Sequence, residues 1–435
     1  MTGIEIGIAV LLLLIVLLAL RMPIGVALIG VSFLGLWMLT SWNVAWGALG
    51  LIPYKFAANW ILSSVPMFLM LGYISYHTKL TEGLFRAARA WLSVLPGGLA
   101  IAAILGSAGF AAVSGSSIAC SATMGRIAVP EMLKSGYHPQ LATGTVAVAG
   151  TIGALIPPSV IMILYGIVAQ VPIAELFLGG ISAGLLTAVG YIIVVMLRVT
   201  IDPSLAPSTD ERASWATRIA VLGETWPVIL IMVGIFTGLF GGLFTPTEAG
   251  AVGATLATLV AILKRTFTWE RFIAAIKETV LTTGALIIIA VGASLLTRFL
   301  ALSGTADFLS GAVLDSGAGP MTVLLGIVLI YLLLGMFLEP IGAMLLTLPI
   351  LLPMVDGAGF DLLWFGIIVT KLLEIGMITP PIGMNVFVIK GIVGKSITTS
   401  AIFRGIWWFL IMDLILLAIL VAFPRLVTFL PEIWG

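Results

Sequence analysis

Small hydroxyl residues, glycines and paired prolines gather in one part of the sequence, in a pattern that could bind a small cation. Ser114, Ser116 and Ser117 stand around a glycine, and Gly153 precedes the proline pair 157–158. Proline lacks an amide hydrogen, so carbonyl oxygens one turn earlier lose their partners, and glycine permits backbone angles that turn such oxygens into a cavity. Hydroxyl and carbonyl oxygens suit a hard cation, and we expect Na⁺. The alternative is that these groups only cap a helix and stabilise a kink.

The second half of the sequence carries a corresponding set of groups. Carbonyl oxygens near Leu338 and Glu339 predict one half of a second sodium site. The break at Gly376 and the hydroxyl of Thr379 predict the other half. Glu339 stands in an apolar stretch, where a carboxylate is a functional candidate. It could ligate an ion, take up a proton or accept hydrogen bonds from backbone amides.

Groups that could bind an organic anion follow both proline pairs. A helix that starts after each pair would point its positive end toward the same place, which favours an anionic group. Asn385 follows the second pair by one turn and could bind a carboxylate, and Ser159 holds a similar position after the first pair. Arg126 could pair with a substrate, or it could extend toward the cytoplasmic edge of a membrane.

Three charged residues lie in the last quarter of the chain. Lys371 and Glu374 stand three residues apart on one predicted helix face and are expected to neutralise each other. Asp413 has no partner that the sequence identifies.

The sequence lacks the common motifs of enzyme active sites. It contains no His-Glu-x-x-His motif, no paired aspartates for a metal-dependent transferase and no phosphate-binding loop. His77 and His138 lie far apart, and Cys120 is the single cysteine, which excludes a zinc spacing and a disulfide framework. We therefore expect no enzymatic activity and no cofactor, so energy for transport would come from a gradient or another subunit.

The elements that must position these groups are membrane helices. Apolar residues make up 61% of the 435 residues and charged residues 9%, whereas soluble chains carry about 25% charge. The net charge of +1 gives no reason to expect nucleic acid. A helix needs about 20 apolar residues to cross the hydrocarbon. We predict ten such spans, at about 4–20, 22–40, 59–78, 141–169, 176–197, 226–243, 247–263, 279–300, 362–393 and 405–423.

Two further regions, 96–133 and 320–355, are apolar but interrupted, and we predict that they are re-entrant helical hairpins. At one constant offset Pro130 matches Pro353, Gly153 matches Gly376, and the two proline pairs coincide. An odd number of predicted spans separates the hairpins, so the repeat is expected to be inverted. Interrupted spans paired in this way are the sequence pattern of a transport site. The alternative is a duplicated scaffold with ordinary proline kinks.

These elements predict an all-α polytopic membrane protein with scaffold and transport domains. Lysines and arginines concentrate in one set of loops, including the polar loop 198–225, which places these loops in the cytoplasm and both termini in the periplasm. The segments before the hairpins are expected to be interfacial arm helices or plain surface helices. The predicted parts are scaffold helices at 1–78, a first repeat at 79–175 (arm helix, hairpin 96–133, broken span 141–169), scaffold helices and the cytoplasmic loop at 176–300, a second repeat at 301–395 (arm helix, hairpin 320–355, broken span 362–393) and a C-terminal scaffold helix at 396–435.

Four motifs, at 114–119, 150–159, 245–250 and 376–385, resemble in this order the large membrane subunit of TRAP transporters (tripartite ATP-independent periplasmic transporters, DctM/SiaM type). The resemblance covers nearly the whole chain. It implies an elevator-type secondary transporter of the bacterial inner membrane, driven by sodium ions and importing a carboxylate such as a C4-dicarboxylate or sialic acid. It also implies two partners, a small four-helix membrane subunit (DctQ/SiaQ type) and a periplasmic substrate-binding protein (DctP/SiaP type).

The resemblance and the residue pattern together give the candidate site residues. For sodium these are Ser114, Ser116, Ser117, Gly153, Ile156, Pro158, Leu338, Glu339, Gly376, Thr379 and Pro381. For substrate they are Ser117, Arg126, Ser159 and Asn385. Three other interpretations stay open: a self-sufficient divalent-anion/sodium symporter, a proton-coupled variant, and a membrane protein that transports nothing. The first would carry Ser-Asn-Thr at its hairpin tips, where this chain has Ser-Gly-Ser-Ser and Glu-Pro.

Overall fold

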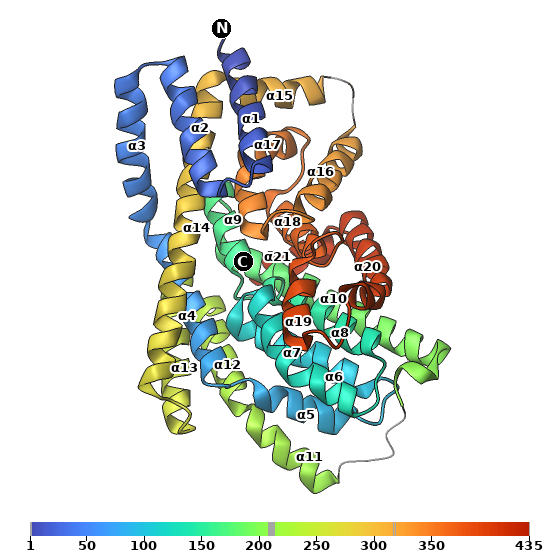
Figure 1. Ribbon diagram of the computed structural model, residues 1–435. Helices are drawn as coiled ribbons and strands as arrows, with labels where there is room; N and C mark the ends of the chain where they lie inside the picture. Colours follow the sequence, from blue (N-terminus) through green and yellow to red (C-terminus); the bar gives the residue numbers. More distant parts are fainter. Residues whose placement is uncertain (1, 208–213, 316, 318, 435) are drawn as a thin grey trace.

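The structure is a computed structural model that describes residues 2–207, 214–315, 317 and 319–434. Every regular element within these residues is helical, and none is a strand (Figure 1). This confirms the all-α fold class. Six stretches, including the continuous run Trp215–Phe240, are long and apolar enough to cross a membrane, and a bent pair at Trp42–Ala57 and Trp60–His77 raises the number to seven within the described residues. The ten predicted crossings remain a prediction.

One group of helices packs into a column along one side of the molecule (Figure 1). The long helix α14 contacts α1, α2, α3 and α4, and α13 joins α4 to α12. The column consists of α1 (Gly3–Ala19), α2 (Ile24–Leu39), α3 (Trp42–Ala57), η1 (Trp60–Ser63), α4 (Ser64–His77), α12 (Trp226–Phe240), α13 (Pro246–Leu263) and α14 (Trp269–Ser303). We call this group the column.

The remaining long elements follow the same order twice: a helical hairpin, a broken helix and a long helix. The first set is α6 (Gly98–Ser114), α7 (Ser117–Lys134), α8 (Pro139–Ala149), η2 (Gly150–Ala154), α9 (Val160–Ala169) and α10 (Ile173–Ile201). The second set is α16 (Pro320–Gly335), α17 (Pro340–Gly357), α18 (Leu362–Gly376), α19 (Met384–Val393) and α20 (Thr399–Ala422). Both predicted hairpins and both predicted breaks are therefore present as helix-loop-helix units.

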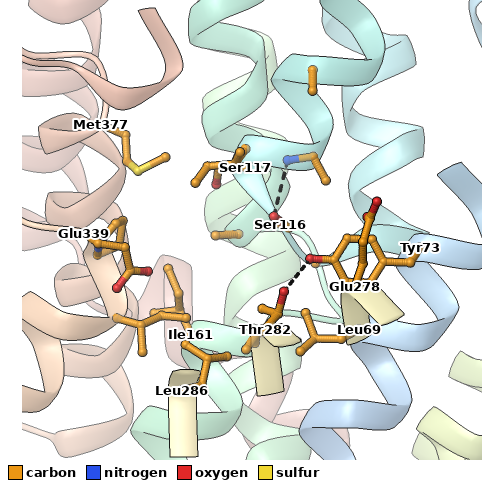
Figure 2. A pocket seen from close by; sticks show the side chains of 18 of the residues that line it. Leu69, Tyr73, Ser116, Ser117, Ile161, Glu278, Thr282, Leu286, Glu339 and Met377 are labelled. Atoms are coloured by element: carbon orange, nitrogen blue, oxygen red, sulfur yellow. Dashed lines mark hydrogen bonds between the residues drawn. The ribbon is translucent and has the colours of Figure 1, made fainter. Parts of the chain in front are cut away.

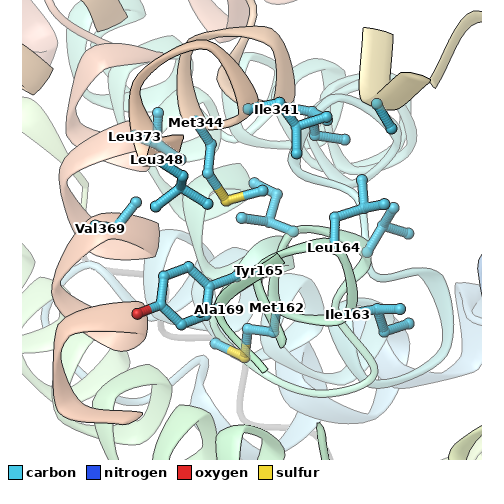
Figure 3. Close-up of a cluster of buried hydrophobic side chains, with 14 of the residues drawn as sticks. Met162, Ile163, Leu164, Tyr165, Ala169, Ile341, Met344, Leu348, Val369 and Leu373 are labelled. Carbon is cyan, nitrogen blue, oxygen red and sulfur yellow. The ribbon is translucent and has the colours of Figure 1, made fainter. Parts of the chain in front are cut away.

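The two sets pack into one body, which we call the hairpin body. Figure 3 shows Met162 and Tyr165 of α9 beside Met344 of α17 and Val369 of α18, in a continuous apolar cluster. The Tyr165 hydroxyl donates to the Leu362 carbonyl at 2.6 Å, which ties α9 to the start of α18. Because α10 contacts α6, α8 and α18, and α20 contacts α8, α10 and α19, both long helices lie with the hairpins.

Short helices connect the two bodies. The predicted arm segments contain α5 (Glu82–Leu92) and α15 (Thr305–Leu314). The predicted polar loop 198–225 contains η3 (Pro203–Leu205), α11 (Trp215–Leu222) and η4 (Gly223–Thr225), with 208–213 outside the described residues. The chain ends in α21 (Arg425–Trp434), which packs on α10.

Two parts of the column differ from the sequence prediction. Helix α3 was not predicted, because Pro53 and Lys55 interrupt its apolar pattern. Helix α14 begins at Trp269, ten residues before the predicted span, where the Thr268 hydroxyl accepts a hydrogen bond from the Arg271 amide at 3.3 Å. The added turns are rich in charge, so an apolar window finds only the later part of the helix.

Candidate functional site

The tip of the first hairpin is formed by a left-handed glycine and a serine cap. Helix α6 ends at Gly115, whose φ of +61° favours glycine, and a Cβ there would run into the Pro158 carbonyl. The Ser116 hydroxyl then accepts a hydrogen bond from the Ala119 amide at 3.3 Å and starts α7. The tip predicted from the Ser-Gly-Ser-Ser sequence is thus present, and it lies against the first break.

The tip of the second hairpin uses a carboxylate for the same purpose. Glu339 caps α17 by accepting a hydrogen bond from the Gly342 amide at 2.9 Å, and Pro340 occupies the first helical position. Of the three roles considered for Glu339, the structure shows the hydrogen bond to a backbone amide.

Each break contacts a hairpin through a glycine. A Cβ on Gly153, in η2, would lie 2.9 Å from the Ser116 carbonyl oxygen, and a Cβ on Gly376, at the end of α18, would lie 2.6 Å from the Gly335 Cα. After the breaks, the Ser159 hydroxyl caps α9 by accepting from the Met162 amide at 3.4 Å. The two proline pairs each contain a cis peptide bond. Hairpin and break therefore meet backbone to backbone in both repeats.

A cavity of about 400 Å³ opens where the column meets the hairpin body (Figure 2). Figure 2 shows Tyr73 of α4 and Thr282 of α14 on one side, joined by a 2.8 Å hydrogen bond between their hydroxyl groups, and Glu339 and Met377 on the other. The remaining wall comes from both tips and both breaks. The lining residues are Leu69, Tyr73, Tyr76, Gly115, Ser116, Ser117, Ile118, Ala119, Ala122, Ala154, Val160, Ile161, Glu278, Thr282, Leu286, Glu339, Pro340, Ile341, Glu374 and Met377.

The charges on this wall are all negative. Glu278, Glu339 and Glu374 line the cavity, and no lysine or arginine is among the described lining residues. Three helices also begin at this wall, α7 at Ser117, α9 at Val160 and α17 at Pro340. Their N-terminal amides favour an anion, whereas the carboxylates favour a cation. The cavity can therefore hold an anion and cations together.

Lys371 and Glu374 do not pair as the sequence predicted. The Lys371 Nζ lies 2.5 Å from Oδ1 of Asp413, on α20. The Tyr191 hydroxyl, on α10, donates to both carboxylate oxygens of Asp413 at 2.8 and 2.9 Å. Glu374 instead accepts a hydrogen bond from the Ser117 hydroxyl at 2.6 Å. Three-residue spacing favours a pair on one helix, but the ion pair of Lys371 is with Asp413 of α20.

Some predicted sodium residues line the cavity, and the others stand beside it. Ser116, Ser117 and Glu339 are in its wall, and Gly153 and Gly376 lie at hairpin contacts. The Thr379 hydroxyl donates to the Ile375 carbonyl at 2.6 Å, so it closes the end of α18. Ser114 is buried, Ile156 and Leu338 complete helical turns with Ile152 and Leu334, the Pro158 carbonyl faces Gly115, and Pro381 is exposed.

The predicted substrate residues are more scattered. Only Ser117 lines the cavity. Arg126 is exposed and donates to the Tyr76 hydroxyl at 2.7 Å, so it bridges α7 and α4 beside the cavity. Ser159 is used as a helix cap, and the buried Asn385 amide donates to the Ala147 carbonyl at 3.4 Å. The structure does not bring these three side chains together.

Sequence reasoning missed the wall that the column contributes. Tyr73, Glu278 and Thr282 line the cavity from α4 and α14. Glu278 and Thr282 stand four residues apart on one face of α14. Polar residues at helical spacing in an apolar segment were the available signal.

The whole-chain comparison decides the family. The family model described as "Tripartite ATP-independent periplasmic transporter, DctM component" matches residues 11–426. The chain belongs to this family. The TRAP large permease proteins of known name that it matches include SiaM of Vibrio cholerae, named for sialic acid, at 32% identity over 95% of both chains. DctM of the same species, named for C4-dicarboxylates, is 31% identical over 87% of both chains.

A third TRAP relative and two solved structures complete the comparison. UehC of Ruegeria pomeroyi, named for ectoine and 5-hydroxyectoine, is 31% identical over 96% of this chain and 97% of its own. The YdaH transporter of Alcanivorax borkumensis has a TM-score of 0.60 at 15% identity, covering 88% of both chains. MtrF of Neisseria gonorrhoeae has a TM-score of 0.56 at 16% identity, covering 84% of this chain and 82% of that one. These two structures show the fold alone.

Membership in the TRAP large permease family settles the class of the protein. Its relatives are transport permeases, so this TRAP protein is a transporter rather than an enzyme. The apolar helices are those of a multi-pass membrane protein. The resemblance recognised in the four sequence motifs is confirmed.

Proposed function

We propose that this TRAP permease imports a small organic anion with a carboxylate group, together with sodium ions. Its relatives are named for sialic acid, C4-dicarboxylates and ectoine, and each of these compounds carries a carboxylate. The observation that carries the proposal is the cavity at which both hairpin tips, both breaks and the column meet. Transport sites of inverted-repeat transporters form at such paired breaks.

The charges of the cavity support the sodium coupling. An anionic substrate would be attracted by the N-termini of α7, α9 and α17 but repelled by three carboxylates. Cations that enter with the substrate would remove this repulsion. Backbone carbonyls at the tips, the Ser116 hydroxyl and the Glu339 carboxylate are hard oxygen ligands for them. We therefore propose one sodium site in each half of the chain, where the hairpin tip meets the broken helix.

The division into two bodies supports an elevator mechanism. The cavity lies at the boundary, with α4 and α14 on the column side. The arm helices α5 and α15 connect the column to the hairpins. Because α20 packs closely on α8, and α10 packs on α6, α18 and α20, we infer that they move with the hairpin body, although the sequence assigned both to the scaffold. An inverted relation between the repeats would let the body present its site to either side.

We further propose the two partners and the location that the family implies. A separate small membrane subunit would support the column, and a periplasmic binding protein would deliver the substrate. The membrane would be the bacterial inner membrane, with both termini in the periplasm. A self-sufficient symporter would need no binding protein, and a proton-coupled variant would need no sodium.

The sodium coupling is tested by the melting temperature of the purified full-length chain. We compare NaCl with equimolar KCl and choline chloride, which keeps the ionic strength constant. Binding to the folded state stabilises it by about 2.7 kcal/mol at a hundredfold excess of ligand over Kd. We expect a saturable rise in NaCl alone. Identical curves in the three salts would contradict sodium coupling and favour the proton-coupled variant.

A further inference from the structure

The carboxyl group of Glu374 forms no ion pair with a basic side chain among the described residues. Glu374 is 1% exposed, in the last turn of α18. The nearby Lys371 is engaged with Asp413 at 2.5 Å, and both of these residues are at most 1% exposed. Lys371 and Asp413 therefore neutralise each other. Glu374 remains as an additional buried carboxylate.

The hydrogen bonds of Glu374 leave one oxygen free. Its Oε2 accepts from the Ser117 hydroxyl at 2.6 Å. Its Oε1 is buried and has no hydrogen-bond partner in the part of the chain that the structure describes. A neutral hydroxyl cannot compensate a full negative charge. Buried charges in proteins are paired or coordinate a metal ion, because an isolated carboxylate loses its hydration without replacement.

The surroundings of Glu374 supply further oxygen ligands from the other repeat. Glu374 lines the cavity together with Ser117 and the tip residues Gly115 and Ser116, whose backbone carries carbonyl groups. Ser117 and the tip belong to the first repeat, and Glu374 belongs to the second. Oxygen-bearing groups from both repeats therefore line the cavity beside one buried carboxyl group.

We propose that Glu374 and Ser117 form a sodium site that bridges the first hairpin and the second broken helix, in addition to the two sites at the tips. A single carboxylate with hydroxyl and carbonyl oxygens fits a monovalent ion. Calcium takes six to eight oxygens, usually with several carboxylates, and magnesium keeps several waters. This inference rests on the proposed sodium coupling. The bridging ion would hold the first hairpin against the second broken helix while the substrate is bound in the cavity.

The test measures the binding of radioactive sodium to the purified full-length chain and to three variants. Glu374→Gln keeps the shape of the side chain and removes its charge. Ser117→Ala removes the hydroxyl partner. Ser121→Ala is the matched control, because Ser121 lies one turn later on α7, is buried and without a hydrogen-bond partner among the described residues, and is outside the described cavity wall.

We expect Glu374→Gln to bind one sodium ion fewer than the wild-type chain. Ser117→Ala should need about a tenfold higher sodium concentration to fill the same site, and Ser121→Ala should behave as the wild type. Without sodium, the melting temperature of Glu374→Gln should equal or exceed that of the wild type, since an uncompensated charge has been removed. This last result excludes misfolding as the cause of the lost ion.

Sodium binding by the wild-type chain distinguishes a failure of the bridging site from a failure of the proposed sodium coupling. If the wild type binds sodium and Glu374→Gln binds the same number of ions with the same half-saturation, the bridging site is wrong while sodium coupling stands. If the wild type binds sodium and Ser117→Ala leaves the half-saturation concentration unchanged, this result alone also contradicts the bridging site. If the wild type binds no sodium, the proposed coupling itself fails, and the bridging site fails with it.

Discussion

Glycines determine how closely the hairpins approach the breaks. At Gly153 and Gly376 a single added carbon would meet the backbone of the facing hairpin, so these positions accept no side chain without moving it. The sequence analysis singled out both glycines from the repeat, and it expected them to expose carbonyl oxygens. The structure adds that both glycines also form the hairpin contacts, with Ser116 and Gly335. The sequence alone does not show which residues lie opposite these glycines.

We predict that Gly376→Leu abolishes transport. The side chain would push Gly335 and the second hairpin away from α18, and overpacking of this kind costs about 1–3 kcal/mol even where the fold survives. Gly326→Leu is the matched control, because Gly326 lies on the same hairpin with no atom within 4 Å of its added Cβ. Substrate uptake is measured in proteoliposomes with equal amounts of folded protein. Wild-type uptake by Gly376→Leu would remove this argument.

Helices from different parts of the chain are joined by a buried polar network. Lys371 of α18 pairs with Asp413 of α20, and Tyr191 of α10 donates to the same aspartate. The Tyr191 hydroxyl also lies 2.9 Å from that of Thr151, which reaches the first break. Local spacing predicted the wrong partner for Lys371, because the helix that carries Asp413 is distant in sequence. Helices and breaks could be predicted from local patterns, whereas this network required the packing.

We predict that Lys371→Met destabilises the folded chain by about 3–5 kcal/mol, because it leaves the buried Asp413 carboxylate without its counter-charge. The double variant Lys371→Met/Asp413→Leu should recover most of this loss, since both charges are then absent and Tyr191 keeps its contact with Thr151. Thermal unfolding of the wild type and of the variants, with Asp413→Leu alone completing the cycle, gives the coupling energy. A double variant whose loss equals the sum of the two single losses would show that the two residues act independently.

The whole molecule consists of a column and a hairpin body with a cavity between them. The hairpins and the broken helices that follow them were predictable because glycines, prolines and apolar periods are local signals. The cavity wall from α4 and α14 could not be predicted. Tyr73, Glu278 and Thr282 line the cavity only because the column packs against the hairpin tips. The assignment of α10 to one body or the other likewise depends on packing rather than on hydropathy, which is high in both bodies.

The central claim is that a sodium gradient drives this chain to import a carboxylate. The most direct measurement reconstitutes the chain with the proposed small subunit in proteoliposomes and adds the proposed binding protein loaded with radiolabelled sialic acid, a C4-dicarboxylate or ectoine in turn. We predict uptake of at least one of them under an inward sodium gradient, and its loss when potassium replaces sodium or the binding protein is omitted. Uptake that is equal in sodium and potassium would contradict the account.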